Sequence, residues 1–327
     1  MPPDRPRVYV TRRLPGDALD ILARACDVRL HEGELPPPYE ELARETARSE
    51  ALVCLLTDRV DAALIAGAPR LRAISTMAVG VDHIDLAAAT ARGIPVGHTP
   101  GVLTETTADL AFALLLAAAR RIVEADAFVR AGRWRTWSPE LLLGRDVHGA
   151  TLGIVGFGAI GQAVARRAAG FGMRVLYASR RDVPFDAATR VPLEELLAAS
   201  DFVSLHVPLT AETERMIGER ELRLMRSTAI LVNTARGGII DQPALVRALH
   251  EGWIAGAALD VAAVEPIPAG DPLLSAPNVV LAPHIGSASV ATRSRMASMA
   301  VDNVLAALRG ERMPHCANPQ VYGPAQP

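Results

Sequence analysis

The sequence predicts an α/β protein built from two doubly wound parallel sheets. Two stretches of the 327-residue chain alternate short apolar runs with helix-like segments, first over residues 1–100 and again from Thr151. Strands that follow one another through helices form parallel sheets. The chain is also long enough for two domains of roughly 150 residues each.

The first hundred residues contain apolar runs of strand length, separated by segments with helical periodicity. The predicted strands are Arg7–Thr11, Ala51–Leu55, Ala73–Thr76 and Ile94–Val96, and the predicted helices are Asp17–Arg24, Tyr39–Arg48 and Leu86–Arg92.

A long helical stretch is predicted from Thr104 to about Arg130. Its apolar run Leu110–Ala119 falls short of the ~20 residues that a membrane-spanning helix needs, so we expect a buried helix.

The alternation then restarts with Thr151–Val155, and a helix is predicted over Gln162–Phe171. Further strands are predicted at Arg174–Ala178, Phe202–His206, Ala229–Asn233, Ala255–Asp260 and Val279–Leu281, with helices between them such as Gln242–His250.

An amphipathic helix over Ala291–Leu308 has no strand of its own, so we expect it to return to the first domain. The predicted domains are 1–100 plus 290–327 and 101–289. The Pro-rich tail from Pro314 is expected to be poorly structured.

Composition excludes several classes of function. All 34 basic residues are arginine, which excludes Schiff-base chemistry and a Walker-A lysine. The net charge of −2, with acidic and basic residues interspersed, gives no reason to expect nucleic acid or an anionic membrane as a partner. Small ligands are therefore the expected partners.

The chain opens without a signal-peptide pattern, which predicts a cytoplasmic protein. Its cysteines, Cys26, Cys54 and Cys316, are odd in number and far apart, so we expect neither a disulfide framework nor a metal site.

A glycine fingerprint carries the first chemical signal. Gly156, Gly158 and Gly161 follow a predicted strand and open a predicted helix, with Ala159 and Ile160 between them. In such a turn the first glycine permits the bend, the second admits a pyrophosphate and the third lets the helix pack on the strand. The helix N-terminus favours the anion. The pattern indicates a dinucleotide site.

The residues after the next strand bear on the choice of dinucleotide. An NAD-specific fold places an acid about 20 residues after the fingerprint, to bind the ribose 2′-hydroxyl. Here Ser179, Arg180 and Arg181 occupy that place, and two guanidinium groups suit a 2′-phosphate. We therefore favour NADP, with NAD possible. The alternatives are that both arginines are solvated surface residues, or that the loop folds Asp182 back to serve as the acid.

Three polar residues lie at predicted strand ends of the second domain: Arg236, Glu265 and His284. Ligands bind at the carboxyl ends of strands in open α/β sheets. A histidine paired with a carboxylate can act as a general acid, and an arginine can hold a substrate carboxylate. Each residue alone would equally suit a salt bridge or a hydrogen-bonded loop.

Several motifs together resemble the D-isomer-specific 2-hydroxyacid dehydrogenase family. They are Gly156–Gly161, Asn233–Gly237, Leu259–Val261 with Glu265–Pro266, and Pro283–Gly286. The segments Ser75–Asp85, Thr104–Asp109, Trp134–Trp137 and Leu308–Pro314 look like the glyoxylate/hydroxypyruvate reductase branch.

The resemblance implies a Rossmann-type cofactor domain inserted into a flavodoxin-like substrate domain. It also implies NADPH-dependent reduction of glyoxylate to glycolate and of hydroxypyruvate to D-glycerate. His284 would be the general acid, Glu265 would orient it, and Arg236 would bind the substrate carboxylate. The backbone at Val79 and Gly80 would grip the same carboxylate.

Further positions match family sites near the cofactor or the substrate. Thr107, Thr234, Asp260 and Gly286 would lie near the cofactor, and Leu56 and Ser287 would line the substrate pocket. Ile122–Trp137 resembles a dimerisation arm, which predicts a homodimer in which Trp137 reaches the partner's active site. The alternative for this segment is an amphipathic helix followed by two core tryptophans.

Other functions stay open. Glu265 argues against the formate dehydrogenases, which carry glutamine there, and the chain has no room for a regulatory domain of phosphoglycerate dehydrogenase type. A 2-ketogluconate or broad 2-ketoacid reductase remains an alternative, as does a nucleotide-sensing, corepressor-like binding module. We interpret His83, His98 and His206 as structural.

Overall fold

The computed structural model describes residues 5–323, which form two compact units. Unit 1 is formed from the chain up to Leu103 and from Ser287 onward, and unit 2 is Thr104–Gly286. The observed boundaries lie three residues from those expected at 100 and 290.

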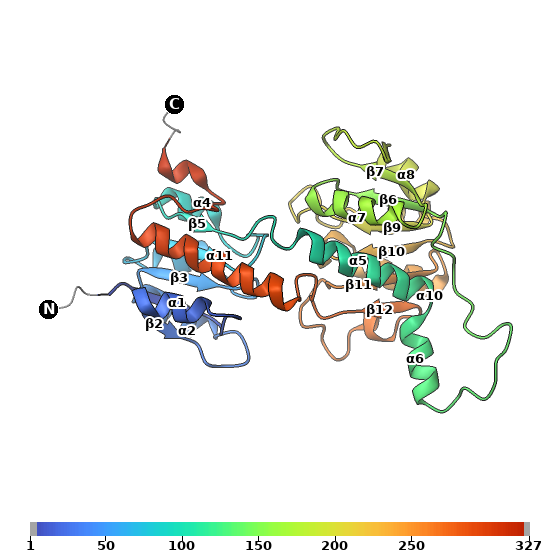
Figure 1. Ribbon diagram of the computed structural model, residues 1–327, viewed down its shortest axis with the longest axis horizontal. Helices are drawn as coiled ribbons and strands as arrows, with labels where there is room; N and C mark the ends of the chain where they lie inside the picture. Colours follow the sequence, from blue (N-terminus) through green and yellow to red (C-terminus); the bar gives the residue numbers. More distant parts are fainter. Residues whose placement is uncertain (1–4, 324–327) are drawn as a thin grey trace. The chain divides into compact units, whose positions relative to one another are not determined.

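Unit 1 contains a parallel sheet with the strand order β2-β1-β3-β4-β5 (Figure 1). Its strands are β1 (Arg7–Val10), β2 (Asp27–Leu30), β3 (Ala51–Cys54), β4 (Ala73–Thr76) and β5 (Val96–Gly97). Its helices are α1 (Ala18–Ala25), α2 (Tyr39–Ala47), α3 (Ala62–Ala66), α4 (Leu86–Ala91) and α11 (Val290–Leu308).

Helices cover both faces of this sheet because alternate strand residues point to opposite sides. Val8 and Val10 pack with α1 and α11 on one face, whereas Tyr9 packs with α2, α3 and α4 on the other. The expected return of the last long helix to the first domain is confirmed.

The prediction of a poorly structured tail is wrong for Pro314–Gly323, which packs against edge strand β5. Ala317 N–H donates to the Val96 carbonyl at 2.7 Å, and a short 3-10 helix follows over Pro319–Tyr322. Asn318 is fully buried, with its side chain accepting from Val96 N–H and donating to the Ile94 carbonyl. The tail thus satisfies backbone groups that an edge strand would leave unpaired.

Unit 2 contains a parallel sheet with the order β12-β11-β10-β9-β6-β7-β8. Its strands are β6 (Thr151–Val155), β7 (Arg174–Ala178), β8 (Ala188–Arg190), β9 (Phe202–Leu205), β10 (Ile230–Asn233), β11 (Gly256–Leu259) and β12 (Val279–Leu281). Its helices include α5 (Thr104–Ala119), α6 (Ile122–Arg130), α7 (Ala159–Ala169), α8 (Leu193–Ala199), α9 (Glu219–Leu224) and α10 (Gln242–Glu251).

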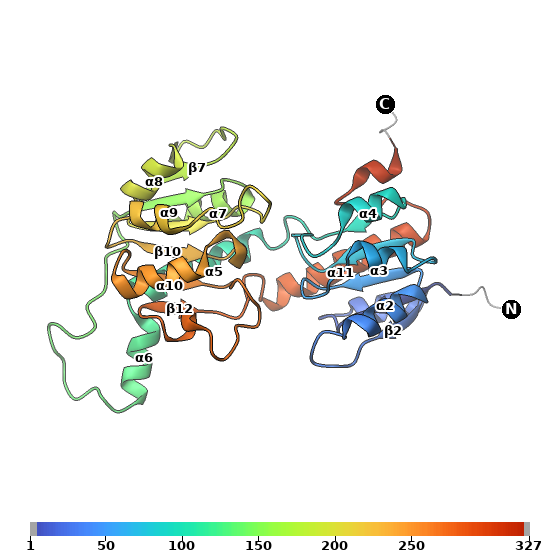
Figure 2. The same cartoon turned by 180° about the vertical axis from the view of Figure 1, so that it is seen from behind.

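The sheet of unit 2 is doubly wound. Helices α5 and α7 pack on one face, and α8, α9 and α10 pack on the other, as the two views show (Figures 1 and 2). The strand order reverses between β6 and β9, and this reversal is the place where such sheets bind ligands.

The predicted helix from Thr104 to Arg130 is in fact two helices, α5 and α6. Arg121 between them lies in the left-handed region with φ of 53°. The Ala119 carbonyl accepts a hydrogen bond from Arg145 N–H at 2.8 Å. That carbonyl is therefore used by a distant segment at the point where α5 ends.

Helix α6 has no buried residues, and it stands away from the layers of unit 2 (Figure 1). Within residues 5–323, no helix is both long and apolar enough to cross a membrane.

Candidate active site

The candidate residues of unit 2 follow five different strands of one parallel sheet. Gly156 follows β6, Ser179 follows β7, Thr234 follows β10, Asp260 follows β11, and His284 follows β12. Parallel strands end at the same edge, so the sheet itself gathers these positions at its carboxyl edge.

The glycine turn has the geometry that its sequence predicts. Gly156 has φ of +92°, and a Cβ there would lie 2.5 Å from the His206 carbonyl oxygen. A Cβ on Gly161 would lie 2.3 Å from the Gly156 carbonyl oxygen, whereas one on Gly158 would meet open space. Space beside Gly158, at the N-terminus of α7, fits a pyrophosphate held by the backbone of Ala159 and Ile160.

The turn after β7 presents two arginines to solvent. Arg180 and Arg181 are both exposed, while Ser179 is half-buried. Arg190 of β8 donates to the Ser179 carbonyl at 2.8 Å and to the Arg180 carbonyl at 3.2 Å. Asp182 accepts a hydrogen bond from the Tyr177 hydroxyl at 2.8 Å, so its carboxylate is directed to that hydroxyl.

His284 and Glu265 form a hydrogen-bonded pair, with 2.7 Å between His284 Nδ1 and Glu265 Oε2. Burial opposes ionisation of Glu265, but the hydrogen bond and charge of His284 outweigh it, and the pKa of Glu265 is lowered. The other oxygen of Glu265 accepts from Ala262 N–H at 3.0 Å. Both carboxylate oxygens of Glu265 therefore have hydrogen-bond partners, which fixes the orientation of the His284 imidazole.

Asp260 holds the loop that carries His284. Its two carboxylate oxygens accept from the N–H groups of Ile285 and Gly286, each at 2.7 Å, and its carbonyl accepts from His284 N–H. His284 lies in the left-handed region with φ of 54°, a conformation that these three hydrogen bonds support. Burial raises the pKa of Asp260 despite the two N–H donors.

Two threonines accompany these groups. Thr107 of α5 lies beside Gly286, since a Cβ on that glycine would be 3.4 Å from Thr107 Cγ2. Thr234 Oγ1 is buried and finds no hydrogen-bond partner among residues 5–323. An orphaned hydroxyl at the carboxyl edge fits a site that a polar cofactor completes.

The turn that carries Arg236 is held by hydrogen bonds from a fully buried asparagine, Asn233. The Asn233 side chain donates to the Arg236 carbonyl at 2.8 Å and accepts from Ala235 N–H at 3.0 Å. A Cβ on Gly237 would lie 1.9 Å from the carbonyl carbon of Ala262. This close approach brings the turn against the loop that carries Glu265, and the charge of Arg236 helps to lower the pKa of Glu265.

The candidate residues of unit 1 lie in loops after β3 and β4. Leu56 is 37% exposed, and Val79 and Gly80 are partly exposed. The Val79 carbonyl lies 3.0 Å from His98 Nδ1. Ser287, the first residue of the returning segment of unit 1, is also partly exposed.

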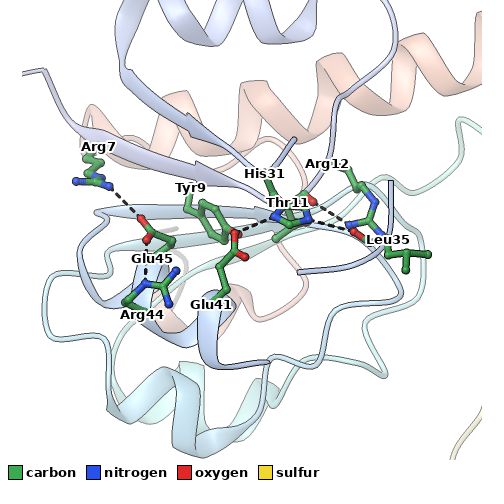
Figure 3. A network of polar contacts seen from close by, with 9 residues as sticks. All are labelled: Arg7, Tyr9, Thr11, Arg12, His31, Leu35, Glu41, Arg44 and Glu45. Carbon is green, nitrogen blue, oxygen red and sulfur yellow. Dashed lines mark hydrogen bonds and ion pairs between the residues drawn. The ribbon is translucent and has the colours of Figure 1, made fainter. Parts of the chain in front are cut away.

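The loop with Leu56 is tied to the preceding strands by buried polar groups. Asp58, only 3% exposed, accepts from Leu55 N–H at 2.7 Å and from the Thr11 hydroxyl at 2.5 Å. Thr11 belongs to the polar network in Figure 3, in which His31 and Tyr9 both contact Glu41.

The histidines interpreted as structural, His83, His98 and His206, have protein partners. His83 Nε2 lies 3.0 Å from Thr76 Oγ1, and His206 Nε2 lies 2.8 Å from Ser204 Oγ. Within residues 5–323 no group of three or more histidine, cysteine or acidic side chains could hold a metal ion.

The tryptophans of the predicted arm are not core residues: Trp134 is 60% exposed and Trp137 is 78% exposed. The alternative of two core tryptophans is wrong for this chain.

Sequence reasoning gave no role to Asn233, Gly237, Tyr177 or Asp58. Asn233 and Gly237 belong to the motif Asn233–Gly237. The signal that could have identified Asn233 is a polar residue at the end of an apolar strand. Tyr177 and Asp58 act through partners three to 47 residues away, which no local pattern reveals.

A glycine turn at a helix N-terminus, followed in the same sheet by a His–Glu pair and an arginine, defines a dinucleotide-dependent oxidoreductase of carbonyl or hydroxyl groups. Residues 112–286 match the family D-isomer specific 2-hydroxyacid dehydrogenase, NAD binding domain. The chain belongs to this family, and it is an NAD(P)-dependent D-2-hydroxyacid dehydrogenase.

Individual relatives agree with this assignment. A glyoxylate reductase of Korarchaeum cryptofilum is 56% identical over 322 residues, covering 97% of each chain. The crystal structure of a Thermus thermophilus protein has a TM-score of 0.91 and 52% identity, covering 95% of this chain and 99% of the other. An NADPH-dependent glyoxylate/hydroxypyruvate reductase from Sinorhizobium meliloti, solved with NADP and malonate, has a TM-score of 0.86 and 33% identity, covering 96% and 98%.

Proposed function

We propose that this protein reduces glyoxylate to glycolate and hydroxypyruvate to D-glycerate, with NADPH as the reductant. The observation that carries the proposal is the His284–Glu265 pair at 2.7 Å, next to the turn of Arg236. The substrate class is supported by relatives named glyoxylate reductase that are 50% and 56% identical over 97% of this chain.

The residues of the chain divide the work as follows. NADPH, when bound, supplies the hydride that adds to the keto carbon. His284 donates a proton to the carbonyl oxygen from Nε2, because Nδ1 is engaged by Glu265. Glu265 keeps that ring oriented through its contact with Nδ1.

The substrate carboxylate needs a separate anchor. Arg236 supplies a guanidinium group that can bind a carboxylate through two N–H donors, and backbone N–H groups at Val79 and Gly80 add further donors. Leu56 and Ser287 line the pocket in this proposal. Thr107, Thr234, Asp260 and Gly286 lie on the cofactor side.

The turn after β7 supports the proposed preference for NADPH over NADH. Ser179, Arg180 and Arg181 offer a hydroxyl and two exposed guanidinium groups to the 2′-phosphate. The acid in the same turn, Asp182, contacts the Tyr177 hydroxyl.

Steady-state kinetics of the purified protein test this function. Glyoxylate, hydroxypyruvate, pyruvate and 2-ketogluconate are each supplied with NADPH and with NADH, and absorbance of the reduced nicotinamide is followed. We expect the fastest turnover with the first two acids and NADPH.

Other results of the same experiment have distinct meanings. A preference for 2-ketogluconate keeps the mechanism and changes the substrate. A preference for NADH would mean that Arg180 and Arg181 are solvated surface residues without a role in cofactor binding. Nucleotide binding without turnover of any acid indicates a nucleotide-sensing module.

We also propose that the protein is a homodimer formed through α6 and the following segment to Leu143. Seven of the fifteen exposed large hydrophobic side chains among residues 5–323 lie in this segment, including Val123, Trp134 and Trp137. A concentration of exposed apolar side chains in one segment is typical of an interface. Trp137 of one protomer would then reach the substrate site of the other.

A further inference from the structure

The turn between β7 and β8 is anchored at both of its ends. On the β8 side, Arg190 donates through Nε and Nη2 to the Ser179 carbonyl, at 3.2 and 2.8 Å, and through Nη2 to the Arg180 carbonyl. On the β7 side, the Tyr177 hydroxyl contacts Asp182 and Val183. The turn that carries the two arginines is thus not a loose surface loop.

The Tyr177 hydroxyl has a fixed position because its ring is locked in the core. The ring is 2% exposed and stacks on Phe157 of the glycine turn, with centroids 4.0 Å apart and planes 17° apart. Phe185 packs edge-on against the Phe157 ring, with 5.3 Å between the two ring centroids. A hydroxyl on so rigid a ring can hold a flexible carboxylate in one place.

Three contacts converge on this hydroxyl. It donates to Asp182 Oδ1 at 2.8 Å and accepts from Val183 N–H at 3.3 Å, and the Val183 carbonyl lies 3.0 Å away. A hydrogen bond to a carboxylate is stronger than one to a neutral carbonyl, so the single hydroxyl proton serves Asp182. The carboxylate is thereby drawn toward β7.

Asp182 matters because of the charges around it. An acid at this turn of a dinucleotide-binding fold selects NAD by bonding the ribose 2′-hydroxyl, and it would repel a 2′-phosphate. Arg180 and Arg181 precede it directly and are exposed. Glu212, hydrogen-bonded by Thr210, is another acid close enough to Arg180 to feel its charge.

We propose that Tyr177 is a positioning residue for cofactor selection, whose hydroxyl holds Asp182 back and leaves Arg180 and Arg181 free to meet a 2′-phosphate. This inference rests on the proposed preference for NADPH. It adds a residue outside the turn that sets the preference, and it explains how an acid is tolerated beside two phosphate-binding arginines.

The test measures binding of each cofactor alone, by isothermal titration calorimetry, to wild type, Tyr177→Phe, Asp182→Asn and the double variant. Phenylalanine keeps the ring and its stacking but releases Asp182. We expect Tyr177→Phe to raise the Kd for NADPH about tenfold and to leave the Kd for NADH within about twofold. Asp182→Asn in the Tyr177→Phe background should restore the NADPH Kd, whereas Asp182→Asn alone should change it little.

Tyr39→Phe is the matched control. The Tyr39 hydroxyl donates to Asp61 Oδ1 at 2.7 Å in unit 1, so this variant loses the same kind of bond elsewhere. It should leave both Kd values unchanged. Circular dichroism of each variant verifies folding.

Three outcomes would overturn the inference. Equal weakening of NADPH and NADH by Tyr177→Phe would mean a purely structural role. Failure of the double variant to recover would mean that Asp182 is not the group released. An equal gain from Asp182→Asn in both backgrounds would mean that Tyr177 does not restrain it. The preference of wild type itself is judged separately, from its own ratio of Kd values.

Discussion

At the level of single residues, the contact between His284 Nδ1 and Glu265 Oε2 leaves only Nε2 of the ring able to deliver a proton. The loop that carries this ring is held by Asp260 through two N–H···O bonds of 2.7 Å. Orientation therefore comes from two acidic residues with separate duties: Glu265 engages the ring and Asp260 engages the backbone.

His284→Gln should remove most turnover and leave NADPH binding nearly intact. Glutamine keeps a polar side chain of similar reach but cannot donate a proton as an acid, so we expect kcat to fall by about 10²–10⁴-fold. Stopped-flow turnover on glyoxylate and calorimetric Kd for NADPH measure the two effects separately. Loss of NADPH affinity instead would reassign His284 to the cofactor site.

His206 gives a prediction about pH and stability. Burial lowers the pKa of His206 from its usual value of 6.5 to about 4. As pH falls from 6.5 toward 4, the unfolded chain takes up a proton that the folded protein does not, so stability is lost over that range. Above pH 6.5 both states are neutral and the effect vanishes.

His206→Asn should therefore flatten the pH dependence. Between pH 7 and pH 5 wild type should lose about 1–2 kcal/mol more unfolding free energy than the variant does. Urea denaturation at both pH values measures the difference. Parallel losses in the two proteins would show that His206 titrates normally in the folded state.

At the level of elements, the site depends on two loops that approach each other at the carboxyl edge of unit 2. The turn after β10 carries Arg236, and the loop after β11 carries Glu265. The two loops come close together at Gly237, where a Cβ would lie 1.9 Å from Ala262 carbonyl atoms. Backbone atoms cannot yield as a flexible side chain can, so both loops would have to move.

Gly237→Ala should thus damage both stability and catalysis. We expect about 1–3 kcal/mol less unfolding free energy and a loss of kcat/KM of about 10²-fold, because Arg236 and Glu265 are displaced together. The neighbouring Gly238→Ala is the matched control: the atoms nearest its Cβ would be those of the flexible Leu209 side chain, at 3.3 Å. Similar effects from both substitutions would refute a special role for the 237–262 contact.

The larger elements were predictable from sequence because buried parallel strands are continuous apolar runs. Strand Ala73–Thr76 and strand Arg174–Ala178 were predicted with the bounds observed. β2 was missed because it is an edge strand whose residues are exposed or half-buried, and β8 was missed for the same reason. Helices α3, α8 and α9 have only five to seven residues, too few for a clear period.

The site residues likewise divide into those that a local sequence motif reveals and those that depend on tertiary contacts. Gly156, Arg236 and His284 were identifiable because each occupies a fixed place in a local motif. The break after Ala119 was not, because it depends on a hydrogen bond from Arg145. The roles of Tyr177 and Asp58 likewise depend on tertiary contacts.

At the level of the whole molecule, the exposed apolar side chains of α6 support the proposed homodimer. Ile122 and Val123 are each 56% exposed, and Val129 is 52% exposed. Val123 and Leu143 also border a groove of about 910 Å³ formed with the starts of β10, β11 and β12. A second protomer would bury this surface.

Val123→Asp should therefore convert a dimer into a monomer. The substitution places a charge among the exposed apolar side chains of α6, and aspartate in the first turn of a helix favours the helix, so α6 itself should persist. Light scattering coupled to gel filtration should show the mass of two chains for wild type and of one for the variant. Val290→Asp, at a valine that is 89% exposed in the first turn of α11, is the matched control and should leave the mass unchanged.

If Trp137 serves the partner's substrate site, the monomeric variant should also show a raised KM for the 2-oxo acid with an unchanged Kd for NADPH. A wild-type mass of one chain at micromolar concentration would refute the interface, and Trp137 would then lose its proposed role.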